Sequence, residues 1–425
     1  MLEIQKNIKH YKTLVKNFTS LSILQITNYL FPLITLPYLV RVLGPEKYGL
    51  VNFAMAFGAY FVTICDYGFN LSVTKQISIN RDNKIKIDEI FSSVITSKIF
   101  LGLISALILA TIILNIERFS NDAEVYLLSY GIVLGNILFP IWFYQGIEDM
   151  KYITIITFCS RLLGTVSIFL IINTANDYTS LVLIYALTSI LIGISGLLIS
   201  IIKFKVSLAV PGFSSIKYQF KEGLQIFVST LAINLYTSTN IFLLGILVND
   251  TAVGYFAAAD KIRIAAQNVV PTISQTVFPH INKILNDSFE KFVSFIKGLI
   301  KYQTIISFTI SLLLFLFAKE IVLLVLGNNY PQSIPVLKII SFLPLLSSFT
   351  TIFTVNVLIP MDLKNDFMKT FLAAGIISLI TAFIFVPVLL VSGTAIAYVI
   401  AEITAAMISF WFVNRKIKLF MIKWI

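Results

Sequence analysis

Apolar runs about as long as a membrane span recur from one end of the chain to the other. A helix needs roughly 20 mostly apolar residues to cross a bilayer. Segments of that kind lie at 18–40, 50–73, 93–114, 125–146, 153–173, 179–202, 223–248, 253–278, 296–317, 335–358, 370–390 and 393–413. The pattern predicts an all-α integral membrane protein with twelve transmembrane helices.

The composition agrees with this class. Hydrophobic residues make up 57% of the 425 residues and charged residues only 12%, whereas a soluble domain is about 45–50% apolar and about 25% charged. The first span is too long for a signal-peptide core and lacks a small-residue cleavage site, so we expect it to remain as a helix. Cys65 and Cys159 both fall inside apolar spans and suggest neither a disulfide framework nor a metal site.

An internal repeat divides the chain into two halves. With a shift of 205 residues, EKYGLVNFA at 46–54 lies over TAVGYFAAA at 251–259, and TKQISINRDN at 74–83 lies over PHINKILNDS at 279–288. Six spans in each half with the same orientation predict parallel repeats, which form two six-helix lobes around a central cavity.

The expected organisation is a cytoplasmic tail, an N-lobe, a linker, a C-lobe and a basic tail, at 1–17, 18–204, 205–222, 223–413 and 414–425. The linker is basic and amphipathic, which suits a strip lying on the lipid surface. A solvated loop explains the same residues equally well.

The basic residues are distributed unequally between the two sides of the membrane. If the N-terminus is cytoplasmic, 25 of the 32 lysines and arginines, Lys98 among them, fall in segments on the cytoplasmic side. This asymmetry is typical of membrane proteins. It places both termini in the cytoplasm and explains the net charge of +11 without a nucleic-acid partner.

Motifs for catalysis or cofactor binding are missing from the sequence. The two histidines, His10 and His280, cannot form a histidine-based metal cluster. The sequence has no P-loop, no nucleotide-binding glycine loop and no nucleophile elbow, and its loops are short. A membrane glycan enzyme usually needs a large extramembrane segment for its catalytic groups. We therefore expect neither an enzyme nor a cofactor.

Polar residues inside the spans are the candidates for function, because such residues are costly in a membrane and usually face a cavity or a partner helix. The candidates for substrate binding are Gln25, Asn28, Arg161, Asn234, Asp260, Lys261, Arg263 and Gln267. Asp66 and Glu402 are candidates for binding a coupling ion or for gating.

Structural roles compete with each of these hypotheses. Polar side chains also join transmembrane helices through ordinary hydrogen bonds, and Asp260 and Arg263 can neutralise each other on one helix face. Lys261 lies about 160° around the helix from Arg263, so both cannot point into one cavity. Lys261 is the better candidate to reach outward to the membrane interface.

Several segments resemble one transporter family. The opening NFTSLSILQITNYLFPLITLPYLVRVLGPEKYGLVNFA, followed by DYGFNLSVTKQIS, closely resembles the O-antigen and polysaccharide flippases of the Wzx type. These belong to the multidrug/oligosaccharidyl-lipid/polysaccharide (MOP) exporter superfamily. IWFYQGIEDMKYIT, LGNNYPQSIPVLKIIS and SGTAIAYVIAE, at 141–154, 326–341 and 392–402, resemble other recurring segments of the family.

The resemblance implies that the protein moves an undecaprenyl-pyrophosphate-linked oligosaccharide from the inner to the outer leaflet of the bacterial plasma membrane. By analogy, Lys261 or Arg263 would hold the pyrophosphate, and Asp260 would orient or gate them. The family context also suggests association with polysaccharide polymerase machinery. Proton or sodium counter-transport through Glu402, Asp66 or Asp260 is a further hypothesis.

Three alternatives compete with this interpretation. A peptidoglycan-precursor flippase would be expected to have fourteen spans. A multidrug antiporter of the MATE type has twelve, but it usually takes cationic drugs, for which a cavity with Lys261 and Arg263 is a poor host. An O-antigen polymerase would need a longer external loop than any in this sequence.

Overall fold

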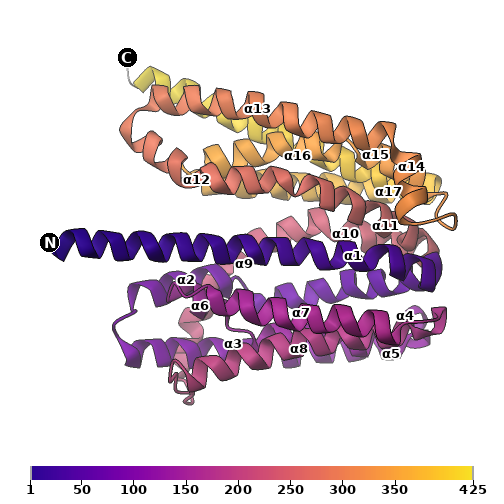
Figure 1. Ribbon diagram of the computed structural model, residues 1–425, viewed down its shortest axis with the longest axis horizontal. Helices are drawn as coiled ribbons and strands as arrows, with labels where there is room; N and C mark the ends of the chain where they lie inside the picture. Colours follow the sequence, from indigo (N-terminus) through magenta and orange to yellow (C-terminus); the bar gives the residue numbers. More distant parts are fainter. Residues whose placement is uncertain (1, 424–425) are drawn as a thin grey trace. The chain divides into compact units, whose positions relative to one another are not determined.

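The computed structural model describes residues 19–416, except for the side chains of 21, 235–237, 269, 275, 279 and 286, and it describes only the backbone of 2–18 and 417–423. The predicted tail at 1–17 and most of the tail at 414–425 therefore lie outside the fully described residues. Every regular element in the described part is a helix, as Figure 1 shows. The prediction of an all-α protein is confirmed.

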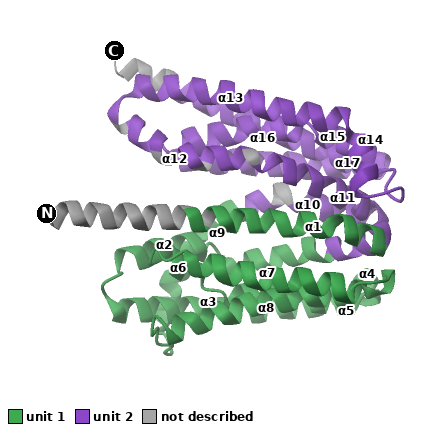
Figure 2. Ribbon diagram, in the orientation of Figure 1, with its two compact units in different colours: residues 1–43, 54–230 green, residues 44–53, 231–425 purple. Residues whose placement is uncertain are grey.

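The chain packs into two compact units, coloured separately in Figure 2. Unit 1 comprises Met1–Leu43 and Ala54–Thr230, and unit 2 comprises Gly44–Phe53 and Leu231–Ile425. A short part of the first long helix thus packs with the second half of the chain. The lobes and the linker expected from the sequence are groups of membrane spans, whereas these units are groups of residues that pack together. The boundaries of the lobes and the linker stay predictions.

Unit 1 contains α1 without residues 44–53, the helices from α2 to α8, one short 3-10 helix and most of α9. These elements are α1 (Leu2–Asp66), α2 (Phe69–Ile79), α3 (Lys84–Asn115), α4 (Glu117–Asn121), α5 (Ala123–Leu138), α6 (Ile141–Gly146), α7 (Lys151–Ile171), η1 (Ala175–Asp177), α8 (Tyr178–Ile202) and α9 (Phe213–Thr237).

Helices α5 and α8 pack closely because small residues line their contact. A Cβ atom on Gly135 would lie 2.3 Å from the backbone of Ser189, and one on Gly193 would lie 2.4 Å from the carbonyl oxygen of Gly135. Small residues at such interfaces let helix backbones approach one another in a membrane. This contact is a main part of the packing of unit 1.

Unit 2 contains the end of α9 and the remaining helices. These are α10 (Thr239–Leu247), α11 (Asp250–Gln267), α12 (Val269–Asp287), α13 (Phe289–Leu316), α14 (Ala318–Val325), α15 (Ser333–Ile340), α16 (Leu343–Thr351), the π-helix η2 (Ile352–Leu358) and α17 (Lys364–Lys423).

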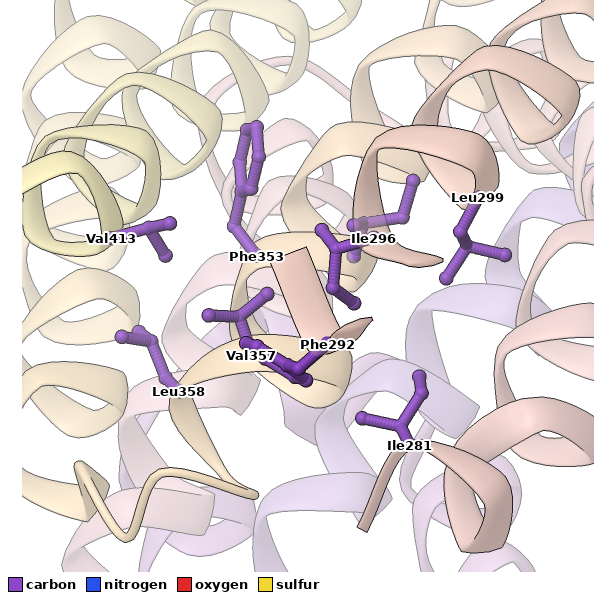
Figure 3. Packing of buried hydrophobic residues seen from close by; sticks show 9 residues of the cluster. Ile281, Phe292, Ile296, Leu299, Phe353, Val357, Leu358 and Val413 are labelled. Carbon is purple, nitrogen blue, oxygen red and sulfur yellow. The ribbon is translucent and has the colours of Figure 1, made fainter. Parts of the chain in front are cut away.

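A hydrophobic cluster, shown in Figure 3, joins four elements of unit 2. Ile281 comes from α12, Phe292 and Ile296 from α13, Val357 from η2 and Val413 from α17. All five side chains are buried. Helices that are far apart in the sequence are therefore held together by one apolar core.

Among the described residues, eight helices are long and apolar enough to cross a membrane, and two of them are much longer than one span. Ser22–Ile79 has 58 residues and Lys364–Lys416 has 53, whereas a span needs about 20. Each contains a residue with positive φ, Gly44 at 70° and Leu390 at 52°, where the helix is kinked. The protein is a multi-pass membrane protein.

Five predicted spans are interrupted within the described residues. The span expected at 50–73 breaks at Tyr67 and Gly68, and the one at 335–358 breaks at Ser341 and Phe342. The span expected at 125–146 breaks before Pro140, which has no N–H to donate and restricts the residue before it. The span at 253–278 breaks at Asn268, and Pro271 follows in the first turn of α12, where the missing N–H costs little. The span at 223–248 breaks at Ser238, between α9 and α10.

The two halves of the chain begin equivalent helices in the same way. Asn83 Oδ1 accepts a hydrogen bond of 3.1 Å from the N–H of Lys86 at the start of α3. Ser288 Oγ accepts one of 3.4 Å from the N–H of Lys291 at the start of α13. The two capping residues are 205 positions apart, the shift that relates the halves in sequence. The repeat thus extends to local hydrogen bonding.

Candidate functional site

Three of the candidate residues meet on one face of α11, at positions i, i+3 and i+7. The Arg263 Nε atom lies 2.7 Å from Asp260 Oδ1, and Arg263 Nη1 donates a hydrogen bond to Gln267 Oε1. The guanidinium carbon lies 5.3 Å from the ring centre of Tyr398 on α17. We call Asp260, Arg263, Gln267 and Tyr398 the Arg263 cluster.

The cation in this cluster is buried, since only 3% of Arg263 is exposed. Burying a charge is costly unless it is paired and hydrogen-bonded, which explains the carboxylate and the amide beside it. A guanidinium has five N–H donors in a planar fork. Three polar neighbours do not use all of these donors. The guanidinium can therefore donate further hydrogen bonds to an oxygen ligand such as a phosphate.

Glu402 lies one helical turn beyond Tyr398 on α17. It is only 4% exposed, and its carboxylate forms no hydrogen bond or ion pair within the described part of the chain. Tyr398 packs against a small cluster of buried alanines that includes Ala401 and Ala405. Sequence reasoning missed Tyr398, although it stands four residues before Glu402 in the segment AYVIAE.

Lys261 lies on a different face of α11 from Arg263. Its side chain is exposed, whereas those of Asp260 and Arg263 are buried. The buried cation of this helix is therefore Arg263.

A second buried ion pair lies in unit 1. Lys98 Nζ is 2.8 Å from Asp66 Oδ1 and donates a hydrogen bond of 3.1 Å to the carbonyl oxygen of Asn136. Asn70 Nδ2 donates one of 3.2 Å to Asp66 Oδ2. The Lys98 side chain is 1% exposed. Sequence reasoning counted Lys98 with the cytoplasmic basic residues and gave Asp66 no partner, although Lys98 stands in the apolar run ITSKIFLGL.

The remaining candidates are half-buried and belong to other helices. Gln25 and Asn28 lie on α1 and Arg161 on α7, all in unit 1, and Asn234 lies on α9 in unit 2. Of the predicted substrate-binding set, Asp260, Arg263 and Gln267 are in contact with one another. Within the described residues, no group of three or more His, Cys, Asp or Glu side chains is placed to hold a metal ion.

A close backbone contact in unit 2 pairs equivalent positions of the two repeats. A Cβ atom on Gly49 would lie 1.7 Å from the carbonyl oxygen of Asp250, and one on Gly254 would lie 1.9 Å from that of Pro45. Pro45 and Asp250 are 205 residues apart, as are Gly49 and Gly254. In each repeat the glycine therefore contacts the equivalent carbonyl group of the other repeat, as in a two-fold symmetric interface.

Sequence comparison relates the chain to polysaccharide transporters. A family model described as polysaccharide biosynthesis protein matches residues 14–285. A protein of Escherichia coli (strain K12) named "Putative O-antigen transporter" is 33% identical over 404 residues, which cover 95% of this chain and 97% of that protein. A protein of Shigella dysenteriae with the same name is 28% identical, covering 87% of this chain and 92% of its own length.

Solved structures of MOP transporters share the fold. An inward-facing MATE family multidrug transporter has a TM-score of 0.70 at 16% identity, covering 94% of this chain and 98% of that one. A MOP transporter from Pyrococcus furiosus, described as having a binding pocket of reversed polarity, has a TM-score of 0.62 at 16% identity. It covers 94% of this chain and 96% of that one. The chain therefore belongs to the polysaccharide biosynthesis protein family, the O-antigen and polysaccharide flippases of the MOP superfamily.

Proposed function

We propose that the protein moves undecaprenyl-pyrophosphate-linked O-antigen or polysaccharide repeat units from the inner to the outer leaflet of the bacterial plasma membrane. The names of the relatives support a glycan substrate, and the MATE-like fold supports transport by alternating access. The protein would act as a transporter and not as an enzyme such as an O-antigen polymerase.

The buried Arg263 is the observation that carries this proposal. A cation inside an apolar membrane protein stabilises an anion there, and the pyrophosphate is the anionic part of the proposed substrate. Arg263 would bind the pyrophosphate through the N–H donors that its neighbours leave unused. Asp260 would pair with the guanidinium between transport cycles, and the pyrophosphate would replace it as the partner of Arg263 when the substrate binds.

Twelve spans would follow from the helices if three assumptions hold, and the charge asymmetry would then place both termini in the cytoplasm. Ser22–Ile79 and Lys364–Lys416 would each cross the membrane twice, and the broken pair α9–α10 would cross once. The pair α11–α12 would be the remaining span. This span is less apolar than the others because α11 carries Asp260, Lys261 and Arg263.

The reciprocal contact at Gly49 and Gly254 supports two parallel repeats. Such repeats are related by an axis along the membrane normal, and a contact on that axis pairs each residue with its own equivalent. The two halves would rock about contacts of this kind during transport.

The membrane potential would assist export. An inside-negative potential favours outward movement of an anion by about 2.3 kcal/mol per charge per 100 mV. Asp66, beside Lys98, and Glu402 would be the sites at which a counter-transported proton or sodium ion acts.

A MATE-type exporter of cationic drugs is the second candidate, since it shares the fold. A buried arginine disfavours a cationic substrate, because the two like charges repel each other in a medium of low dielectric constant. The same arginine attracts a pyrophosphate. The Arg263 cluster therefore favours the flippase.

Complementation tests the proposal. The flippase gene would be deleted in the source bacterium and replaced by the wild type, Arg263→Ala, Arg263→Lys, Asp260→Ala/Arg263→Ala or Lys261→Ala at matched protein levels. Surface polysaccharide would be measured on gels, with drug sensitivity measured in parallel.

We expect the wild type and Lys261→Ala to restore surface polysaccharide and Arg263→Ala to lose it. Arg263→Lys should retain part of the activity, because lysine keeps the charge but not the planar fork. The double variant removes the ion pair as a whole and should fold but not transport. Full activity in both variants that have alanine at position 263 would refute the pyrophosphate role.

A further inference from the structure

A polar pocket of about 320 Å³ lies in unit 1 between α2, α3 and the first turns of α9. Pockets that bind small ligands usually start at about 300 Å³. The lining residues that matter here are Gln76, Asn80, Lys86, Glu89, Tyr218 and Gln219. None of them belongs to the Arg263 cluster.

The wall formed by α9 is held firmly against α2. The Gln76 and Gln219 side chains exchange two amide hydrogen bonds, each 3.0 Å long. The ring of Tyr67 stacks on that of Phe227 at 4.6 Å. A Cβ atom on Gly68 would lie only 2.7 Å from the carbonyl oxygen of Gly223, so the two backbones nearly touch. The pocket is therefore preformed, as ligand sites usually are.

The charges in the pocket cancel. Lys86 Nζ lies 2.9 Å from Glu89 Oε2, and Glu89 Oε1 accepts a hydrogen bond from Ser215 Oγ. An anion would meet the Glu89 carboxylate, and a cation would meet the Lys86 ammonium. The pocket thus suits an uncharged ligand rather than a phosphate.

The pocket still has hydrogen-bonding capacity to offer. In the Gln76–Gln219 pair, each amide donates one N–H to its partner and accepts one hydrogen bond from it. Each side chain therefore keeps a second N–H donor and a second acceptor site on its oxygen. The Asn80 amide donates one N–H to the carbonyl oxygen of Gln76 at 2.8 Å. Tyr218, half-exposed at the rim, adds an aromatic face and a hydroxyl. Amides, hydroxyls and one aromatic ring suit the many hydroxyls and the apolar face of a sugar.

We infer that this pocket binds an uncharged sugar ring of the lipid-linked substrate before translocation. The inference rests on the proposed function, which supplies a glycan that starts in the inner leaflet. The pocket lies among the basic segments at 75–86 and 203–221, which the charge asymmetry places on the cytoplasmic side. A sugar held there would select the correct repeat unit while Arg263 acts on the pyrophosphate.

Direct binding to the full chain in nanodiscs tests the inference. The probes would be the methyl glycosides of glucose, galactose, mannose, N-acetylglucosamine and N-acetylgalactosamine, observed by saturation-transfer NMR, with inorganic pyrophosphate as a competitor. At least one glycoside should bind, and pyrophosphate should not displace it. Asn80→Ala and Tyr218→Ala should weaken that binding about two- to tenfold, the effect of losing one hydrogen bond or contact.

Two control variants match these substitutions. Asn115 donates its amide N–H to the carbonyl oxygen four residues earlier, as Asn80 does. It is the last residue of α3, whereas the pocket is lined by the first turns of that helix. Tyr302 is an exposed tyrosine on α13. Asn115→Ala and Tyr302→Ala should bind like the wild type.

Several results would overturn the inference. These are no binding of any glycoside, binding that survives both pocket variants, or displacement by pyrophosphate. Tighter binding of a nucleotide sugar than of the methyl glycoside of the same hexose would identify the nucleotide sugar as the ligand and would also overturn it.

Complementation separates failure of the inference from failure of the proposed function. If the wild type restores surface polysaccharide and both pocket variants do so fully, the pocket has no part in transport and only the inference fails. If the wild type restores none, the proposed function itself fails. We expect the wild type to restore surface polysaccharide and the pocket variants to restore clearly less than their matched controls.

Discussion

Lys98 and Asp66 show what a charge inside a membrane protein needs in order to be stable. The ammonium lies 2.8 Å from the carboxylate and also reaches the Asn136 carbonyl oxygen, while Asn70 bonds the second carboxylate oxygen. Removing one member of a buried pair leaves an uncompensated charge, whereas removing both often costs little. The pair is thus sensitive to single substitutions.

Lys98→Met or Asp66→Asn should destabilise the protein by about 3 kcal/mol, the lower end of the range for breaking a buried ion pair, because the Asp66 side chain is 20% exposed. The double variant Asp66→Asn/Lys98→Met should recover most of this loss. The measurement is thermal unfolding of the purified protein in detergent. Lys364→Met is the matched control, because its pair with Asp362 is exposed on both sides.

Equal stability of Lys98→Met and the Lys364→Met control would contradict this account of the pair. Lys98 also marks a limit of sequence reasoning at the residue scale. A lysine in a run such as ITSKIFLGL is costly wherever it points, so its cost was predictable. Its partner was not, because Asp66 is on another helix, and hydropathy along a single chain carries no information on which faces meet. Asp260, Arg263 and Gln267 could be grouped because they share one helix.

At the scale of helices, the contact of Gly49 and Gly254 depends on the absence of side chains. A methyl group on either glycine would overlap a carbonyl oxygen of the opposite segment. Other helical glycines of the same chain have open space around them, for example Gly58 and Gly298. Substitution by alanine should therefore lower the stability of the protein at Gly49 and Gly254 and raise it at Gly58 and Gly298.

Gly49→Ala and Gly254→Ala should lower the thermal midpoint and reduce surface polysaccharide, because the segments must move apart. Gly58→Ala and Gly298→Ala should leave activity unchanged and stabilise the protein by up to about 1 kcal/mol, since alanine favours a helix. Stability would be measured by thermal unfolding and activity by complementation. If all four variants behaved alike, the close contact would not be important for folding or transport.

Long apolar helices were predictable from the sequence, but their interruptions were not. Hydropathy averages over a window, so the run at 125–146 reads as one span although Pro140 ends the helix before it. Pro140 itself indicates the end of a helix, but the average hydropathy of the window does not show it. The break at Asn268 has a weaker signal, because asparagine occurs in helices as well as at their ends.

For the whole molecule, the charge asymmetry predicts both termini and the segment at 203–212 in the cytoplasm, and 173–177 outside. Alkaline phosphatase fused after Asn173 should therefore be active, and a fluorescent protein fused at the C-terminus should be fluorescent. A fluorescent protein inserted at 208 should also be fluorescent. An inactive phosphatase fusion together with a dark C-terminal fusion would show that the orientation is the opposite of the predicted one. The pocket at α2, α3 and α9 would then face the outside, where a substrate in the inner leaflet could not reach it.

The fold class and the family were predictable because they depend on features spread over the whole chain: apolar length, charge asymmetry, the repeat and the order of family segments. A binding site depends on a few side chains from different elements. Tyr398 belongs to the Arg263 cluster only because α17 packs beside α11. The pocket of unit 1 likewise depends on how α2, α3 and α9 pack together.

The most direct test of transport by Arg263 is flipping in a purified system. Vesicles containing the wild type or Arg263→Ala would be loaded with a fluorescent undecaprenyl-pyrophosphate-linked repeat unit of the source bacterium, and a membrane-impermeant reagent would report the leaflet that holds it. We predict that the wild type exchanges the lipid between leaflets and that Arg263→Ala does so no faster than empty vesicles. Equal exchange by both would contradict the pyrophosphate site, and no exchange by the wild type would contradict the flippase function itself.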